Sequence, residues 1–411
     1  MDASLLEILK CPFCGTAMTL WEGNTAVQPG RELDYGVLGC QCCAFPVVAG
    51  IPVIVVDDRA RAAMKCLDQG MPQEALVTML GGGEDPARGD AIRAMLDRLD
   101  AVTFQEAIGI LSPDAEGTYF VYRFSDPTFV MAHALIDGIG QHAAPRAGRI
   151  LDLCGGSGHL TRLLDALDPA GGTYLADLFF WKLWLAKTFT VPRCIPICCN
   201  GNNPLPFVSD TFSMVVLADA FPYIWQKRML ADDMVRISGP RGTIVMPHLH
   251  SSLGWNFSQG MALTPDAYAG LFSALEPRLF SDRKLLDEAL ERGAVDLSSP
   301  QSAEAIGDEA SFTLIATKGP ALYRRHETLP VAPPAAVLKP NPLYKQERRD
   351  GSLVLTLAFP TPGYEEEFGE CLRYLPPTIT LPAELTMKAL GADYESLRRR
   401  RIIIDVPANY C

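Results

Sequence analysis

The stretch that most constrains the fold runs from residue 149 to 160 and reads Arg-Ile-Leu-Asp-Leu-Cys-Gly-Gly-Ser-Gly-His-Leu. Apolar residues lead to an acid, a glycine-rich turn follows, and an amphipathic segment begins at His159. A short apolar run bounded by such a turn is typical of a buried parallel strand, and ligands of parallel sheets bind where the strands end. The sequence therefore predicts a site for a nucleotide-sized ligand at this turn, as in enzymes that use a soluble cofactor.

Strands and helices alternate between residues 146 and 318. Strands are predicted at 149–153, 172–176, 194–198, 212–218 and 243–246, and helices lie between them. This alternation favours an α/β fold with a doubly wound, mostly parallel sheet.

The chain has 12 cysteines, several of them paired near the N-terminus. Cys11 and Cys14 form one Cys-x-x-Cys pair, and Cys40 and Cys43 form another after 25 intervening residues. Two such knuckles complete a tetrahedral thiolate site for Zn²⁺, which leaves no open coordination position, so we predict a structural zinc. Cys42 could replace Cys40 or Cys43, although the spacing favours the outer two. The other interpretation is that these are buried cysteines without a metal.

A resemblance extends the zinc interpretation to the first 57 residues. The segments 5–14 and 45–54, above all Gly50-Ile51-Pro52, resemble the small zinc-ribbon proteins that activate tRNA and translation-factor methyltransferases. The resemblance implies a zinc ribbon at residues 1–58 that is fused to its enzyme.

Three features of the core favour S-adenosylmethionine over a dinucleotide. The turn does not fit the Gly-x-Gly-x-x-Gly phosphate cradle. Asp177 closes the next strand, where a carboxylate can accept both ribose hydroxyls. The segments 205–215 and 235–243 resemble the regions around the fourth and fifth strands of class I S-adenosylmethionine-dependent methyltransferases. That resemblance implies a seven-stranded methyltransferase core at residues 146–318.

The resemblance also implies which residues bind the cofactor. Glycines of the turn would let backbone amides approach the methionine part, Asp152 would act through the turn and the cofactor's ammonium group, and Asp177 would bind the ribose. The usual acid at the adenine amine is missing, and Asn200 or Asn202 occupies its neighbourhood. The predicted set is Asp152, Cys154, Gly155, Gly156, Gly158, Asp177, Leu178, Asn200, Asn202 and Asp219. Departures such as Cys154 in place of glycine leave an inactive domain as an alternative.

Two of the six histidines, His248 and His250, follow the fifth strand of the core, at the edge where substrates bind. We expect one of them to face the pocket as a general base, with Tyr223 as an orienting group. A metal site formed by both histidines is disfavoured, because no acid lies near them in the sequence. The other interpretation is that both are loop residues bonded to the backbone.

The segments that flank the core have weaker patterns. Residues 59–145 are predicted to form a helical linker and cofactor cap, with helices at 60–80, 90–99 and 127–139. Tyr119, Tyr122, Arg123 and His133 are candidates for the pocket, or pack within the cap.

The composition changes near residue 320. Prolines mark a linker at Pro330, Pro333, Pro334, Pro340 and Pro342. A strand is expected at 353–359 and a helix at 382–397. Residues 319–411 are interpreted as a small accessory α+β module for substrate recognition or dimerisation.

Charge and hydropathy exclude other classes of protein. A net charge of −12 makes nucleic acid an unlikely partner. The arginines at 398–401 fit a solvated helix end. No apolar run is long enough for a membrane span and no secretory signal is visible, so a cytoplasmic protein is expected.

The sequence thus predicts an S-adenosylmethionine-dependent methyltransferase that acts on a small molecule or peptide-type substrate by in-line transfer. A protein partner could bind through the ribbon or the C-terminal module, and an oligomer is compatible with the sequence. The first alternative is a non-catalytic, methyltransferase-like binding or scaffold protein. The second is a nicotinamide-dependent oxidoreductase, which the spacing of the turn disfavours.

Overall fold

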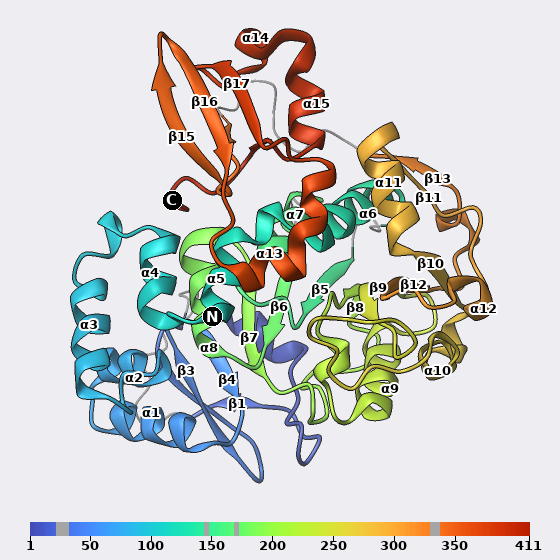
Figure 1. The fold of residues 1–411 in the computed structure, drawn as a ribbon. Coiled ribbons are helices and arrows are strands. Elements are labelled where there is room, and N and C mark those ends of the chain that lie inside the picture. Colours follow the sequence, from blue (N-terminus) through green and yellow to red (C-terminus); the bar gives the residue numbers. More distant parts are fainter. Residues whose placement is uncertain (22–32, 144–147, 168–171, 329–337) are drawn as a thin grey trace.

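The computed structural model describes residues 1–21, 33–143, 148–167, 172–328 and 338–411, with only the backbone at 141–143. Figure 1 shows a central sheet covered by helices, N-terminal strands at one end of it, and a C-terminal module above the helices. Pro330, Pro333 and Pro334 of the predicted linker lie outside the described residues. Every helix in the described residues is too short or too polar to cross a membrane.

The centre of the fold is a mixed sheet built from residues 149–316. Its strands are β5 (Arg149–Leu153), β6 (Tyr174–Asp177), β7 (Ile195–Cys199), β8 (Phe212–Val216), β9 (Thr243–His250), β10 (Pro277–Ser281) and β12 (Ser311–Ala316). They lie in the order β7-β6-β5-β8-β9-β12-β10; the first five are parallel, and β12 is antiparallel to both neighbours. The five predicted strands are confirmed. Because β5 stands among the parallel strands, its turn opens at the middle of their carboxyl edge.

The sheet has eleven strands within the described residues: seven belong to residues 149–316, where a seven-stranded core was predicted, and four more come from the N-terminal segment. The other four are β1 (Thr19–Leu20), β2 (Gly36–Gly39), β3 (Ala44–Val48) and β4 (Ile51–Ile54). β4 pairs in parallel with β7, with Val53 opposite Cys198 and Ile54 opposite Cys199. All four residues are buried, and the pairing covers backbone groups that β7 would otherwise expose at an edge. The N-terminal strands β1 to β4 therefore continue the core sheet.

Helices cover both faces of the sheet, as a doubly wound fold requires. Along β5, Ile150 enters one apolar cluster, while Leu151 and Leu153 enter the other, because strand side chains alternate between faces. The first face is covered by α6 (Pro127–Ala143), α7 (His159–Leu167), α8 (Phe180–Leu185) and α11 (Asp282–Arg292). The second is covered by α9 (Lys227–Ser238), α10 (Pro265–Leu271) and α12 (Ala303–Ile306).

The predicted helical region before the core is present, with one correction. It contains α1 (Asp58–Asp68), α2 (Pro72–Met79), α3 (Pro86–Leu96), α4 (Phe104–Leu111) and α5 (Ala115–Tyr122). The single helix predicted across 60–80 is wrong. Gly70 has φ of 72° and Pro72 begins α2, so the chain turns between α1 and α2.

The C-terminal module combines a small sheet with short helices. Its elements are β14 (Lys339–Pro340), β15 (Tyr344–Arg349), β16 (Ser352–Leu357), α13 (Pro362–Phe368), β17 (Thr378–Pro382), α14 (Met387–Leu390), α15 (Tyr394–Arg399) and β18 (Ile403–Ile404). The strand predicted at 353–359 is confirmed. The helix predicted at 382–397 is wrong at its start, which belongs to β17, and is interrupted at Gly391, whose φ is 56°.

This module is fastened to the cap over the core. Tyr364 Oη donates to the carbonyl of Tyr122 at 3.4 Å, and Tyr410 Oη donates to the carbonyl of Phe120 at 2.8 Å. Both acceptors belong to α5, so the C-terminal residues fix the helix that lies over the glycine-rich turn.

Candidate functional site

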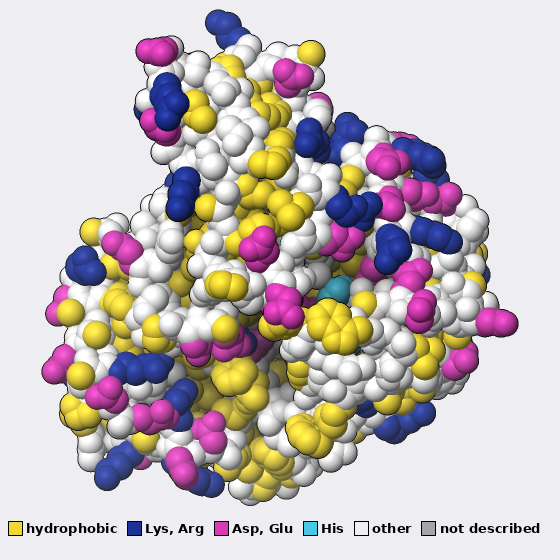
Figure 2. Space-filling model, in the orientation of Figure 1, with side chains coloured by type: hydrophobic (Ala, Val, Ile, Leu, Met, Phe, Trp, Pro, Cys, Tyr) yellow, Lys and Arg dark blue, Asp and Glu magenta, His cyan; other side chains and the backbone are white. Residues whose placement is uncertain are grey.

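The carboxyl ends of β5, β6, β8 and β9 meet at one edge of the sheet, which is where parallel sheets bind ligands. On the face drawn in Figure 2, a histidine side chain is visible in a recess beside acidic side chains. Three non-glycine residues at this edge have positive φ: Cys154 at 60°, Asp219 at 64° and His248 at 58°. Such strained backbone concentrates at functional sites, so this edge is the candidate site.

The turn after β5 is packed tightly by the protein itself. A Cβ atom on Gly155 would lie 2.5 Å from the Asp152 side chain, and one on Gly156 would lie 2.8 Å from the ring of Phe120. The glycines therefore make room for neighbouring side chains, a reason that the sequence did not reveal. Within 154–158, only Cys154 and Gly155 are partly exposed and can face a ligand.

Asp177 is tied to this turn. Its Oδ2 accepts the N–H of Gly156 at 3.0 Å, and its Oδ1 accepts the N–H of Phe179 at 2.9 Å. Burial raises the pKa of Asp177, while the ammonium of Lys182 opposes the rise. Lys182 is itself paired with Glu116 of α5, Nζ to Oε1, at 2.5 Å. Since each carboxylate oxygen can accept more than one hydrogen bond, Asp177 can still receive ligand hydroxyls.

Asp152 lies beneath the turn and is 1% exposed. Its Oδ2 accepts the Thr161 hydroxyl at 2.6 Å, and its Oδ1 has no hydrogen-bond partner among the described residues. Burial raises the pKa of Asp152 to about 7, although the Thr161 bond opposes this. Asp152 is thus a buried acid fixed by the helix after the turn, and its action on the cofactor through the turn stays a prediction.

Replacement of Asp152 with asparagine is expected to stabilise the protein at high pH. The folded-state pKa of about 7 lies above the ordinary 3.8, so ionisation of this acid costs stability as the pH rises from 3.8 through 7. The full cost is roughly 4 kcal/mol, of which about 1 kcal/mol arises between pH 6 and pH 8. Urea unfolding of wild type and D152N at these two pH values measures the difference, and an advantage independent of pH would contradict the assignment.

The two asparagines predicted beside the adenine, Asn200 and Asn202, differ in how many hydrogen bonds their side chains already accept. Asn200 is partly exposed, and its Oδ1 accepts the N–H of Asn202 at 2.8 Å. The Oδ1 of Asn202 accepts the N–H groups of Trp225 at 2.6 Å and Gln226 at 3.2 Å. This engagement leaves Asn200 the better placed of the two for an adenine amine. Leu178 is 38% exposed beside them, where it can cover an apolar ring.

Asp219, His248 and His250 form a compact group, here called the Asp–His–His group. One ligand-type atom from each lies within 4.8 Å of the others, and His250 Nε2 is 3.1 Å from Asp219 Oδ1. The expectation that only one histidine faces the site is wrong, because residues i and i+2 of a strand share a face. The premise that no acid accompanies the histidines is also wrong. Asp219 follows β8, which pairs with β9, so the acid is near in space though distant in sequence.

A β-bulge sets the position of His248. In the pairing of β9 with β12, Pro247 and His248 stand opposite the single residue Thr313. Pro247 has no N–H to donate to a hydrogen bond between the strands, and the backbone of His248 has a left-handed conformation. The direction of β9 therefore changes at these two residues. Bulges of this kind commonly aim a side chain beside an active site.

Asp282, the first residue of α11, orients His248. Its Oδ2 lies 3.3 Å from His248 Nδ1 and accepts Ser311 Oγ at 2.6 Å, while its Oδ1 accepts Thr313 Oγ1 at 2.7 Å. With Nδ1–H directed at Asp282, Nε2 of His248 keeps its lone pair. Burial lowers the pKa of His248, but Asp282 and Asp219 raise it more, so the net shift is upward.

Asp282 was not among the predicted site residues, because an acid in the first turn of a helix ordinarily indicates only a favourable interaction with the helix dipole.

Of the four candidate cap residues, Tyr119 contacts the Asp–His–His group, and Arg123, which is paired with Asp126, packs behind Tyr119. Tyr119 Oη donates to Asp219 Oδ2 at 3.4 Å, and the guanidinium of Arg123 lies 5.1 Å from the centre of the Tyr119 ring. Tyr122 instead packs its ring on Tyr364 in the C-terminal module. His133 packs against Phe129 on α6.

Charges from several elements act on Asp219. Burial by itself raises the pKa of Asp219, but the hydrogen bond from His250 and the charges of His248 and Arg123 lower it below its ordinary range. Glu367 of α13 is close enough for its pKa to be raised by burial and then by Asp219. The next residue of α13, Phe368, packs its ring against Tyr119 with the centroids 6.0 Å apart, so the C-terminal module lies near the Asp–His–His group. Glu367 was not among the predicted site residues.

Tyr223 contacts the site through its ring. Its hydroxyl donates to the carbonyl of Ser258 at 2.6 Å, and its ring stands edge-on to His250 with the centroids 6.0 Å apart. An orienting role would therefore act by packing on the imidazole.

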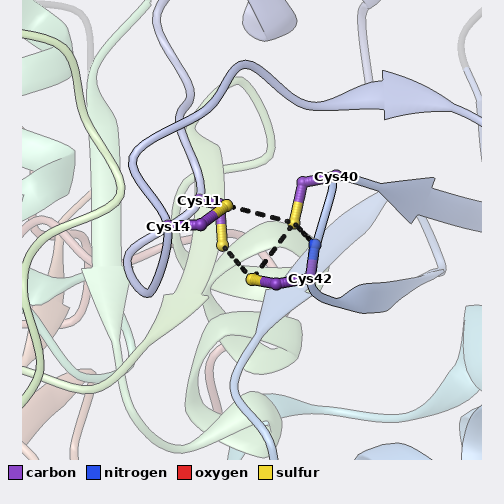
Figure 3. Close-up of side chains that lie close together, drawn as sticks. All are labelled: Cys11, Cys14, Cys40 and Cys42. Carbon is purple, nitrogen blue, oxygen red and sulfur yellow. Dashed lines mark hydrogen bonds between the residues drawn. The ribbon is translucent and has the colours of Figure 1, made fainter.

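The N-terminal cysteines form the second cluster, shown in Figure 3. Cys11, Cys14, Cys40 and Cys42 converge from two turns, with Sγ–Sγ distances of 3.7 Å (Cys11–Cys42), 3.8 Å (Cys14–Cys40) and 3.8 Å (Cys40–Cys42). Zn–S bonds of about 2.3 Å in a tetrahedron place sulfur atoms about 3.8 Å apart. The observed spacing therefore fits Zn²⁺, and four thiolates would close its coordination.

This set differs from the predicted one at one position, since Cys42 stands where Cys43 was expected. The backbone of Cys43 bonds to Cys40: its N–H donates to Cys40 Sγ at 3.2 Å and its carbonyl accepts the N–H of Cys40 at 2.9 Å. This tight turn brings the thiol of Cys42 to the other three, while Cys43 Sγ lies 3.5 Å from Cys42 Sγ.

Comparisons with known proteins give only distant similarities. No protein-family model matches the chain, and no curated protein matches it. A solved methyltransferase from Thermotoga maritima, described as a possible histamine N-methyltransferase, is 12% identical over 53% of this chain and 100% of its own, with a TM-score of 0.35. A Haloferax volcanii methyltransferase complex with the activator Trm112 is 16% identical over 52% of this chain and 96% of its own (TM-score 0.34). The plantazolicin methyltransferase BamL is 11% identical over 53% and 96% (TM-score 0.35). Similarities at this level assign no function.

Proposed function

We propose that the chain is an S-adenosylmethionine-dependent methyltransferase. The observation that carries the proposal is the unit formed by Asp177 and the turn after β5, joined by the Gly156 N–H. An acid at the end of the second strand suits ribose hydroxyls, and the turn beside it lies at the sheet edge that binds ligands. Cys154 and Gly155 follow β5, and Asp219 follows the neighbouring strand β8; all three are partly exposed at the same edge of the sheet.

The order of the strands supports S-adenosylmethionine over a dinucleotide as the ligand. Dinucleotide-binding sheets have the strand order 3-2-1-4-5-6. In the core sheet here, the antiparallel strand β12 is inserted between β9 and β10. The turn also departs from the Gly-x-Gly-x-x-Gly cradle for a pyrophosphate.

The residues present fit the chemistry of methyl transfer. S-adenosylmethionine supplies an electrophilic methyl group on a sulfonium, so the protein has mainly to align the acceptor with it. The Asp–His–His group lies at the other end of the same edge and would hold the acceptor, a small molecule or a peptide-type substrate. His248, oriented by Asp282, is the better placed histidine to take an acceptor's proton, because its Nε2 faces away from that acid.

Calorimetry of the full chain tests the cofactor. We expect S-adenosylmethionine and S-adenosylhomocysteine each to bind at one site per chain with a dissociation constant of about 1–100 μM, and NAD and NADP not to bind. Binding of a dinucleotide, or of none of the four, would overturn the proposal.

The role of His248 is tested after an acceptor is found by transfer of a labelled methyl group. H248Q is expected to lower turnover by about 100-fold while the affinity for S-adenosylmethionine is unchanged. His133 lies outside the Asp–His–His group, so H133Q serves as the control. Equal turnover in H248Q and wild type would remove His248 from the mechanism.

A further inference from the structure

We propose that Asp219, His248 and His250 bind a divalent transition-metal ion at a second metal site, separate from the cysteines. The metal site itself does not require methyl transfer. What the ion would do there rests on the proposed function.

The ligand atoms already converge. Metal–nitrogen and metal–oxygen bonds of about 2.1 Å bring neighbouring ligand atoms to roughly 3–3.5 Å from one another. His250 Nε2 and Asp219 Oδ1 are 3.1 Å apart, and a ligand atom of His248 lies within 4.8 Å of both. The centres of the two imidazole rings are 5.2 Å apart, so both rings border the same small space.

Outer residues hold two of the three ligands, His248 and Asp219, as in known metal centres, whereas Nδ1 of His250 has no hydrogen-bond partner among the described residues. A metal-binding histidine ordinarily donates its other ring N–H to a carboxylate, which is itself hydrogen-bonded. His248 Nδ1 faces Asp282, and Asp282 accepts the hydroxyls of Ser311 and Thr313. On the other ligand, the Tyr119 hydroxyl donates to Asp219 Oδ2 and leaves Oδ1 toward His250.

The backbone is strained at two of the three ligands. Asp219 has φ of 64°, and His248 has φ of 58° within the bulge of β9. Such conformations cost of order 1–3 kcal/mol each and persist where the surroundings demand them. Here both serve to turn a potential ligand into the same small space.

The ligand set indicates the class of ion and its use. Two imidazoles and a carboxylate suit Zn²⁺, Fe²⁺ or Mn²⁺ and leave coordination positions open, as catalytic metal sites do. His250 is 5% exposed, whereas Asp219 and His248 are partly exposed, so an open position would face the recess. A bound ion would lower the pKa of a coordinated hydroxyl. The inferred acceptor is therefore an alcohol, phenol or enol oxygen. With the ion bound, His248 would be a ligand and not the base, so the acceptor hydroxyl would lose its proton to solvent in the recess. Its oxygen would then take the methyl group from the sulfonium, and S-adenosylhomocysteine would leave.

Metal analysis of the full chain tests the site. After loading with Zn²⁺ and removal of the excess, wild type is expected to retain about two ions per chain, and D219N, H248Q and H250Q about one each. Glu384 is exposed in the C-terminal module, so E384Q is the charge-matched control for D219N and should retain both ions. Circular dichroism and thermal unfolding verify that each variant is folded.

The outcomes separate this inference from the proposed function. If the three variants retain as much zinc as wild type, the second metal site does not exist. Calorimetry with S-adenosylmethionine on the same samples is an independent readout, so loss of the second ion with no cofactor binding in wild type overturns the methyltransferase but leaves the metal site. If one of the three variants misfolds, D282N is tested in its place by titration with Zn²⁺. We expect the affinity of the second site for Zn²⁺ to fall at least about 10-fold in D282N. Unchanged affinity there would also contradict the site.

Discussion

Replacement of Asp177 with alanine is expected to weaken S-adenosylmethionine binding by at least about 100-fold, or roughly 3 kcal/mol, because hydrogen bonds to a charged group carry 1.5–3 kcal/mol each. Under the proposed function this carboxylate accepts the ribose hydroxyls, and its loss also frees the Gly156 N–H that now ties the turn to β6. Both effects act on the same ligand. Calorimetry of D177A with S-adenosylmethionine measures the loss.

The chain offers a matched control for this variant. Asp296 is likewise the last residue of a strand, β11 (Ala294–Asp296), and accepts the N–H of Ser298 at 2.9 Å, as Asp177 accepts that of Phe179. D296A therefore removes the same two-residue turn contact away from the candidate site and should bind S-adenosylmethionine like wild type. If D177A also binds like wild type while remaining folded, the ribose assignment fails.

Much of the secondary structure of the core could be predicted from local sequence patterns. The apolar run before Asp152 and the glycine-rich turn after it are contiguous, so strand, turn and helix follow from a short window. The parallel strands of the core follow from the same alternation. The errors fall where one residue decides the local geometry, as at Gly70 and Gly391, whose left-handed φ interrupts a helical pattern.

The candidate site was harder to predict because it depends on contacts between distant segments. Tyr119 and Asp219 meet although 100 residues separate them, and His248 and Asp282 are 34 residues apart. The contribution of Glu367 requires α13 to lie over the core, and no local pattern encodes that placement. Periodicity did hold the clue to one error, since His248 and His250 differ by two positions and share a strand face.

We predict that the four cysteines bind a zinc ion and that its loss destabilises the whole fold. β4 of the ribbon pairs with β7, the N–H of Lys10 donates to the carbonyl of Pro206 at 3.0 Å, and Leu9 packs in the same apolar cluster as Phe207. Unfolding of the ribbon would therefore expose the edge and one face of the core sheet. C14S should retain about one zinc ion fewer than wild type and unfold at a temperature lower by about 5 °C, or roughly 3–5 kcal/mol.

Adjacent cysteines provide the test of which thiols bind the ion. C42S and C43S make the same chemical change one residue apart, yet only Cys42 belongs to the tetrahedral group. We expect C42S to lose the zinc ion and the stability that C14S loses, because a serine hydroxyl is a poor zinc ligand beside three thiolates. C43S should keep both, since the Cys43 contacts to Cys40 are made by its backbone. Zinc loss in C43S but not in C42S would instead identify Cys43 as the ligand, as the Cys-x-x-Cys spacing predicted. If C14S, C42S and C43S all keep the zinc content and the unfolding temperature of wild type, these cysteines hold no structural ion.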